Sequence, residues 1–151
     1  MSLSELTLNS KVAIVTGGGQ GIGKAISLGL AQCGATVCIV DTNTNAGEDV
    51  ATQIQAMQQK SIALAADVTD NDQVVSMVEK ALETYGHIDI LVNNAGGASG
   101  VNFGIGRVLK ISERDWDSTM AVNLKSVFLC TRAVAKTMLD QKKGSIINMA
   151  S

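Results

Sequence analysis

The residues best suited to chemistry form a glycine-rich stretch near the start of the chain. Five glycines lie among the seven residues 17–23, between a short β-branched run at 12–16 and a segment with apolar residues at helical spacing. A strand, a glycine loop and a helix in this order point bare backbone N–H groups and a helix N-terminus at a phosphate. Each glycine costs backbone entropy on folding, so a plain turn would not need five of them. The stretch therefore predicts a phosphate-binding loop.

Two kinds of phosphate-binding loop compete for this stretch. The segment 18–24 has the spacing of a nucleoside-triphosphate P-loop, but Ala25 stands where that loop needs Ser or Thr to hold magnesium. The strict dinucleotide pattern G-x-G-x-x-G fails too, because no choice of first glycine places all three. The pattern that fits is Thr-Gly-x-x-x-Gly-x-Gly, at Thr16, Gly17, Gly21 and Gly23. The loop alone indicates phosphate binding more firmly than it indicates which phosphate.

Apolar runs alternate with helical patterns along the whole chain. The segments expected to form strands are 11–16, 36–40, 61–66, 88–92 and 145–149. The segments expected to form helices are 22–33, 44–59, the stretch between a cap at Thr69 or Asp70 and Gly86, and 112–141 with a break near Asp117. Strict alternation implies right-handed crossovers and a parallel sheet with helices on both faces. The sequence predicts one domain over residues 1–151 with a doubly wound, Rossmann-type α/β fold of five strands in three layers.

Polar residues interrupt the apolar pattern where the expected strands end. These positions are Thr16, Gly17, Asp41, Asp67, residues 93–96 and Ser151. In an open parallel sheet, ligands bind beyond the carboxyl ends of the strands, where the strand order reverses. The agreement among the expected strands therefore predicts a ligand site along this edge.

Asp41 is the residue that bears on the choice of dinucleotide. It lies 24 residues after Gly17, close to where a carboxylate accepts hydrogen bonds from an adenosine ribose. The same carboxylate repels a 2′-phosphate, which favours NAD over NADP unless Lys24 or a neighbouring loop compensates. An aspartate that only begins the turn before Thr42 is compatible with the same position.

Further blocks extend the dinucleotide interpretation along the chain. They are Asp67-Val68, the Asn-Asn-Ala-Gly run at 93–96, Asn123 within 120–124, and the final block 144–151. In this order and spacing, with the Thr-Gly-x-x-x-Gly-x-Gly loop, they resemble the short-chain dehydrogenase/reductase family over essentially the whole chain. Taken singly, Asp67 is also compatible with a helix cap and Asn123 with a solvent-facing helix residue.

The resemblance implies an NAD(H)-dependent oxidoreductase that transfers a hydride between the nicotinamide and a secondary alcohol or ketone. The cofactor-binding residues that it implies are Gly17, Gln20, Gly21, Ile22, Gly23, Asp41, Asp67, Val68, Asn94, Ala95 and Gly96. The glycine loop would hold the pyrophosphate, Asp41 the ribose and Asp67-Val68 the adenine, with 94–96 beside the nicotinamide. The implied catalytic residues are Asn123, in the proton relay, and Ser151, at the substrate oxygen.

The chain departs from the family after Ser151, its last residue. The family's general acid/base tyrosine, and the lysine one helical turn beyond it, should follow that serine, and Tyr85 lies too early to replace the tyrosine. Hydride transfer requires a proton to move at the oxygen, and Asn123 and Ser151 are poor proton donors. We therefore expect the chain to be inactive alone, as the cofactor-binding part of a longer enzyme. A catalytically incomplete dinucleotide-binding module that works through partners stays open, and a P-loop nucleotide hydrolase is a weaker alternative.

Bulk composition argues against several other classes of protein. The formal net charge of −2 offers no electrostatic case for nucleic acid or an anionic membrane surface. No apolar run approaches the length of a membrane span, and the first ten residues lack the features of a secretory signal. Three cysteines without a C-x-x-C pair, and the single His87, make a metal site unexpected. Buried thiols in a reducing cytoplasm are expected instead.

The resemblance also implies a homo-oligomer, a dimer or tetramer, in the intact protein. Family members associate through the helix that carries Asn123 and the helix after it. The apolar residues of the first helix are Val122, Leu124, Val127, Phe128, Ala133, Val134 and Met138. Because the second helix would follow Ser151, we expect an exposed sheet edge at the fifth strand and poor solubility. The loop 96–106 is equally compatible with a plain connection and with a substrate-facing segment.

Overall fold

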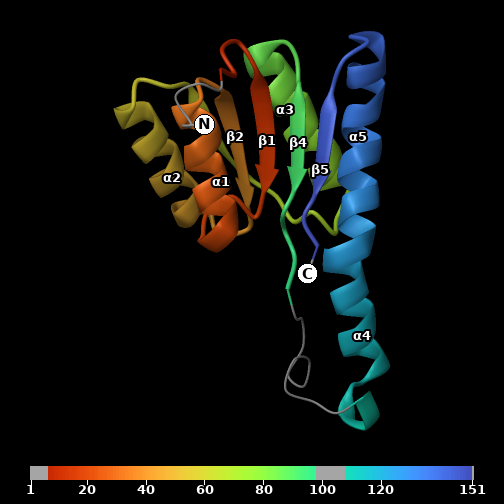
Figure 1. Ribbon diagram of the computed structural model, residues 1–151. Coiled ribbons are helices and arrows are strands. Elements are labelled where there is room, and N and C mark those ends of the chain that lie inside the picture. The colour runs from red at the N-terminus through yellow and green to blue at the C-terminus, as the bar shows by residue number, and fades with distance from the viewer. Residues whose placement is uncertain (1–6, 98–107, 151) are drawn as a thin grey trace.

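The computed structural model describes residues 7–97 and 108–150. Within these residues, five strands form one sheet in the order β3-β2-β1-β4-β5 (Figure 1). They are β1 (Val12–Thr16), β2 (Thr36–Asp41), β3 (Ser61–Ala65), β4 (Ile90–Asn93) and β5 (Ser145–Asn148). Every neighbouring pair is parallel. The parallel sheet predicted from the alternation of elements is confirmed.

The strand order reverses between β1 and β4. The chain runs outward from β1 through β2 to β3, and then returns to place β4 on the other side of β1. The connections that follow β1 and β4 therefore leave the carboxyl edge in opposite directions, which is where open α/β sheets bind ligands. Thr16 ends β1 and Asn93 ends β4, so the glycine loop and the Asn-Asn-Ala-Gly run flank this point.

Helices cover both faces of the sheet. They are α1 (Gly21–Gln32), α2 (Thr44–Ala56), α3 (Asn71–Tyr85), the 3-10 turn η2 (Val108–Lys110), α4 (Glu113–Met120), the π-helical turn η3 (Ala121–Lys125) and α5 (Ser126–Asp140). α1 and α2 pack on one face, and α3 and α5 pack on the other (Figure 1). α4 continues past the carboxyl ends of the strands, beyond the sheet (Figure 1).

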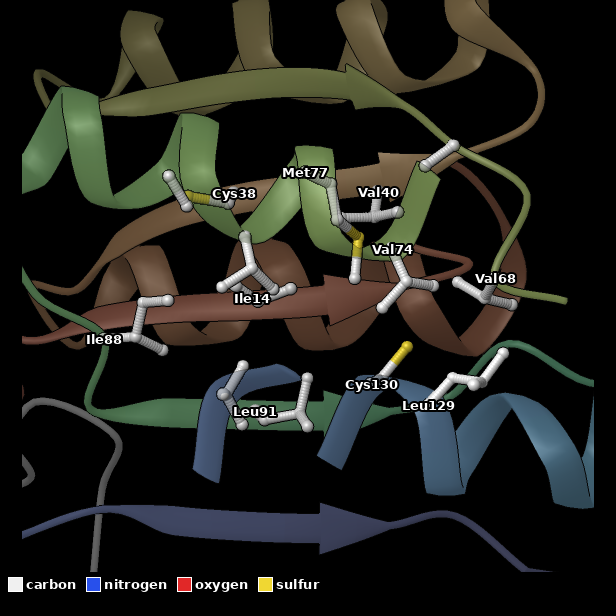
Figure 2. Close-up of a cluster of buried hydrophobic side chains, with 14 of the residues drawn as sticks. Ile14, Cys38, Val40, Val68, Val74, Met77, Ile88, Leu91, Leu129 and Cys130 are labelled. Atoms are coloured by element: carbon white, nitrogen blue, oxygen red, sulfur yellow. The ribbon is translucent and has the colours of Figure 1, made fainter. Parts of the chain in front are cut away.

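Alternate residues of the central strands enter two different cores. In β1, Ile14 faces α3 and α5, whereas Val15 faces α1 and α2. A strand covered on both faces is apolar throughout, because successive side chains point to opposite sides. Figure 2 shows the first core, which gathers Ile14 of β1, Val74 of α3 and Leu129 of α5. These two cores hold the strand ends, and the loops that follow them, in place.

Two helices begin at side-chain caps, and the cap of α3 is one that the sequence predicts. Asp70, one of the two caps expected for α3, accepts hydrogen bonds from the N–H groups of Asp72 and Gln73 at 2.9 and 3.1 Å. These backbone donors hold the pKa of Asp70 below its ordinary value. Ser112 caps α4 by accepting a 3.1 Å hydrogen bond from the Asp115 N–H.

The predicted break near Asp117 is wrong. The chain stays α-helical through this residue, and the irregularity is the π-helical turn η3, with Asn123 at its centre. The Asn123 amide donates a 2.8 Å hydrogen bond to the Thr119 carbonyl one turn earlier. A side chain that bonds this carbonyl competes with the backbone donor of a regular helix. The irregularity therefore lies where the asparagine can reach back.

Two other elements differ from the sequence prediction by more than one residue at one end. α2 ends at Ala56 rather than at residue 59, because Gln58 has a φ of 63°, which leaves the helical region. β4 covers Ile90–Asn93 rather than 88–92, since Asn93 pairs in register with Asn148 of β5. Both shifts leave the order of the elements unchanged.

The apolar residues of the long helical region divide between two faces. Val134 and Met138 are buried in the core beneath α5. Leu124 and Phe128 are 61% and 57% exposed. Helical spacing separates these residues into two faces, but the residue types alone do not show which face packs on the core. At the sheet edge, all residues of β5 are exposed, as expected for that edge.

Three further properties concern the part of the chain that the structure describes. None of its helices combines the length and the hydropathy that crossing a membrane requires. No group of three or more His, Cys, Asp or Glu side chains within it is arranged to hold a metal ion. All three cysteines are buried thiols, as predicted, and burial raises the pKa of Cys38 to about 12 and that of Cys130 to about 11.

Candidate functional site

A cleft of about 380 Å³ opens at the carboxyl edge of the sheet, where the strand order reverses. The loop after β1, the ends of β2 and β3, the exit of β4 and η3 all contribute to its walls. The predicted residues that line it are Gly17, Gln20, Ile22, Gly23, Asp41, Asp67, Val68, Asn94, Ala95 and Gly96. Of the residues predicted to bind the cofactor, only Gly21 is missing from this lining. The fold therefore gathers almost the whole predicted set around one space.

The cleft is also lined by four residues that were not predicted to bind the cofactor. They are Val40, Thr42, Ala66 and Val122. The first three are sequence neighbours of Asp41 and Asp67, so their position at a strand end could have predicted that they line the cleft. Val122 precedes Asn123, but the helix face that turns toward the cleft is decided by packing.

The glycine loop adopts a shape that excludes side chains. Gly17 has a φ of 62°, and a Cβ there would lie 3.0 Å from the Cα of Ala95. A Cβ at Gly23 would overlap the carbonyl oxygen of Gly17, so α1 begins directly against the loop. Among the described residues, Gln20 precedes α1 without a side-chain cap, and the first turn of α1 carries no acidic residue. The N-terminus of α1 is therefore open to an anion.

Asp41 fastens the glycine loop to the end of β2. Its carboxylate is 9% exposed. Oδ2 accepts a hydrogen bond from the Gly19 N–H and Oδ1 accepts one from the Asn43 N–H, both at 2.9 Å. The interpretation of Asp41 as the start of a turn is therefore correct, yet Asp41 also lines the cleft. A carboxylate has about four acceptor sites, so two stay available for a ligand.

Thr16 and Asn94 join the exits of β1 and β4 in both directions. The Thr16 hydroxyl accepts hydrogen bonds from the N–H groups of Asn94 and Ala95, each at 3.0 Å, and donates to the Val92 carbonyl at 3.3 Å. In return, the Asn94 amide donates to the carbonyls of Thr16 and Gly17 at 3.0 and 3.2 Å. Because Thr16 is 2% exposed, water does not compete for these bonds. This reciprocal junction sets the floor of the cleft.

Asp67 and Val68 form the wall contributed by β3. Val68 is buried in the core, and its position beside the cleft is fixed by that packing. The Asp67 Oδ1 accepts hydrogen bonds from the N–H and the hydroxyl of Thr69 at 2.9 and 2.7 Å. Asp67 is therefore not the cap of α3, which is Asp70.

The Asn123 side chain, in η3, forms hydrogen bonds with the backbone that follows β4. Its amide donates to the Gly97 carbonyl at 2.7 Å, and its Oδ1 accepts from the Gly97 N–H at 3.0 Å. A Cβ at Gly96 would lie 2.8 Å from the same Oδ1, which explains the glycine there. Asn123 is thus held by backbone groups and is not a merely solvent-facing residue.

The second predicted catalytic residue, Ser151, lies outside the described residues. Tyr85 ends α3, just before β4 begins, and so lies at the opposite edge of the sheet from the cleft. Its ring packs against the core, and burial raises its pKa. The tyrosine of this chain therefore takes no part in the cleft.

A model of the short chain dehydrogenase family matches residues 11–151. The chain belongs to this family. It is 38% identical over 146 residues to the 3-oxoacyl-(acyl-carrier-protein) reductase FabG of Thermotoga maritima, covering 97% of this chain and 57% of that relative. It is 40% identical over 152 residues to the 2-dehydro-3-deoxy-D-gluconate 5-dehydrogenase of Escherichia coli, covering 100% of this chain and 57% of that relative.

The fold is also shared with solved structures of this family. A metagenomic short-chain oxidoreductase in complex with NADP superposes with a TM-score of 0.88 at 35% identity, over 95% of this chain and 63% of that one. These curated relatives and this structure are named as dehydrogenases, reductases or oxidoreductases. The chain spans about 57% of the length of the two relatives.

Proposed function

We propose that this chain is the dinucleotide-binding part of an NAD(H)-dependent oxidoreductase acting on a secondary alcohol or ketone. The observation that carries the proposal is the convergence of the glycine loop, Asp41, Asp67-Val68 and residues 94–96 on one cleft. Each of these groups follows a different strand, and each suits a different part of a dinucleotide. Membership of the short chain dehydrogenase family supports the class of reaction.

The cleft suits a dinucleotide in shape and in charge. Gly17 and Gly23 keep side chains away from the N-terminus of α1, so a pyrophosphate can approach the backbone N–H groups there. Asp41 offers its two remaining acceptor sites to a ribose diol, and Asp67 and Val68 form the wall for the adenine. When bound, the nicotinamide would accept or supply the hydride.

The preference for NAD follows from the charge of Asp41. A 2′-phosphate beside this largely buried carboxylate would be repelled by about 4 kcal/mol per pair of unit charges 4 Å apart, at an effective dielectric constant near 20. The NADP complex of the metagenomic oxidoreductase belongs to a protein of the same fold. The fold by itself therefore does not exclude NADP, and Asp41 is the residue that argues for NAD here.

Catalysis requires more than the described residues supply. Asn123, held against Gly97, would position a proton relay and not itself donate the proton. We propose Ser151 as the residue that orients the substrate oxygen. The 151-residue chain should therefore bind NAD but show no alcohol oxidation. In the longer enzyme that we propose, turnover that survived substitution of Ser151 would contradict its assigned role.

Calorimetric titration of the chain tests the binding part of this proposal. We expect heat on titration with NAD, weaker binding of NADP, and loss of both with Gly23→Ala, whose methyl group would overlap the Gly17 carbonyl. Gly29→Ala is the matched control, because a Cβ at Gly29 of α1 meets nothing within 4 Å. Tighter binding of NADP would overturn the use of Asp41, and no heat with either dinucleotide would favour an inert fragment. Magnesium-dependent ATP binding would instead revive the P-loop nucleotide hydrolase.

We also infer that the intact protein is a homo-oligomer. Trp116, Met120, Leu124 and Phe128 recur every four residues along α4, η3 and α5, and each is 36% exposed or more. Such spacing gathers apolar side chains on one helix face, which favours burial against a second copy. The buried thiols are consistent with a reducing compartment such as the cytoplasm.

A further inference from the structure

The turn between β3 and α3 is held in place from the side of the long helical region. Lys125, the last residue of η3, donates from Nζ to the Thr69 carbonyl at 3.3 Å. Arg132 of α5 donates from Nη2 to the Asn71 Oδ1 at 2.6 Å. Lys125 therefore ties η3 to the turn that carries Asp67, and Arg132 ties α5 to the first residue of α3.

Thr69, which Lys125 holds, in turn contacts Asp67 in the cleft. Its N–H and its hydroxyl both donate to the Asp67 Oδ1. Two donors occupy the two lone pairs of that oxygen. Among the described residues, Oδ2 is then the Asp67 oxygen that no protein donor contacts, and Asp67 lines the cleft. The orientation of the carboxylate thus depends on where Thr69 is held.

The turn η3 contacts three parts of the site within four residues. Val122 lines the cleft, Asn123 binds the backbone of Gly97 on the β4 side, and Lys125 binds Thr69 on the β3 side. π-helical turns change which residues share a helix face, and they recur at functional sites. This one links the wall assigned to the adenine with the wall assigned to the nicotinamide.

We propose that Lys125 is a positioning residue for adenine recognition, acting through Thr69 on Asp67. The inference rests on the proposed function. Lys125 fixes the turn, Thr69 saturates one carboxylate oxygen, and the other oxygen accepts a hydrogen bond from the exocyclic amino group of the base. A base without that amino group gains nothing from this arrangement.

The test compares NAD with nicotinamide hypoxanthine dinucleotide, which carries a carbonyl oxygen in place of the amino group. We expect Lys125→Met to weaken NAD binding by roughly three- to tenfold in calorimetry, the range for loss of one exposed charged hydrogen bond. Binding of the hypoxanthine analogue should change less than twofold. Lys125→Arg should retain the NAD affinity. Lys136→Met is the matched control, since among the described residues Lys136 pairs only with Asp140 and lies on the exposed side of α5.

The outcomes separate this inference from the function on which it rests. Equal weakening of both dinucleotides would mean a general structural role for Lys125 and would overturn the inference. Unchanged NAD binding in Lys125→Met would overturn it as well, while leaving the proposed function standing. Failure of the unsubstituted chain to bind either dinucleotide would sink both. Thermal unfolding of each variant, expected to match that of the unsubstituted chain, shows that the comparison is between folded proteins.

Discussion

Replacing the Thr16 hydroxyl by a methyl group should weaken the junction between β1 and β4. Thr16→Val keeps the shape and the β-branching of the side chain. It removes the acceptor for the N–H groups of Asn94 and Ala95 and the donor to the Val92 carbonyl. The backbone itself need not move. The perturbation is therefore confined to hydrogen bonding.

The magnitude follows from the burial of those groups. A buried donor left without an acceptor costs roughly 1–3 kcal/mol. Asn94 and Ala95 are half-buried, so the low end of that range applies to each N–H group. Removing a buried hydroxyl returns part of the loss, since the new methyl group needs no partner. We expect the free energy of unfolding to fall by about 2 kcal/mol, which corresponds to a drop in Tm of about 4–8 °C for a chain of this size.

Urea unfolding followed by far-ultraviolet circular dichroism measures this change. Fluorescence of the single tryptophan is the poorer reporter, because Trp116 is 52% exposed on α4, away from the sheet. Thr36→Val is the control, since Thr36 lies half-buried in the neighbouring strand β2 and should change stability by less than about 0.5 kcal/mol. A Thr16→Val variant as stable as the Thr36→Val variant would refute the claim that the Thr16 hydrogen bonds stabilise the fold.

Two other predictions concern buried polar groups. Ser27→Ala should leave stability unchanged or raise it by up to about 1 kcal/mol, because the Ser27 Oγ is buried with no partner among the described residues; clear destabilisation in urea would contradict this. Burial raises the pKa of Asp89, but the Val12 N–H, Lys143 and Lys11 outweigh it and hold the pKa below its ordinary value. A depressed folded pKa adds stability above the unfolded value of about 3.9, and this stability is lost as the pH falls through the folded pKa. The loss of unfolding free energy caused by Asp89→Asn should therefore be smaller at pH 3 than at pH 5. A larger loss at pH 3 would contradict the lowered pKa of Asp89.

The edge of the sheet that carries the site was predictable from sequence. Strands covered on both faces are apolar throughout, so a polar residue such as Asp41 or Asn93 marks a strand end without knowledge of packing. Parallel strands place all such ends at the same edge. The glycine loop was equally predictable from sequence. The positive φ at Gly17 and the contact of Gly23 with Gly17 leave no room for a side chain, so both positions require glycine.

Other parts of the site depended on groups that meet only in three dimensions. Thr42 and Val122 carry no pattern that separates a cleft residue from a neighbour. The position of the π turn reflects a bond from Asn123 to Thr119 that competes with the helix, and not a breaker residue such as the expected Asp117. The contact of Lys125 with Thr69 joins residues 56 positions apart.

The sequence by itself determined the order of the elements, the parallel sheet and the residues at its carboxyl edge. These follow from periodicity and from backbone sterics, which are local properties. Only the tertiary structure decided which face of α5 is buried, which groups form hydrogen bonds with Asp41 and Thr16, and which residues line the cleft. Those choices depend on how helices rotate and dock on the sheet, and docking is settled by the whole core at once.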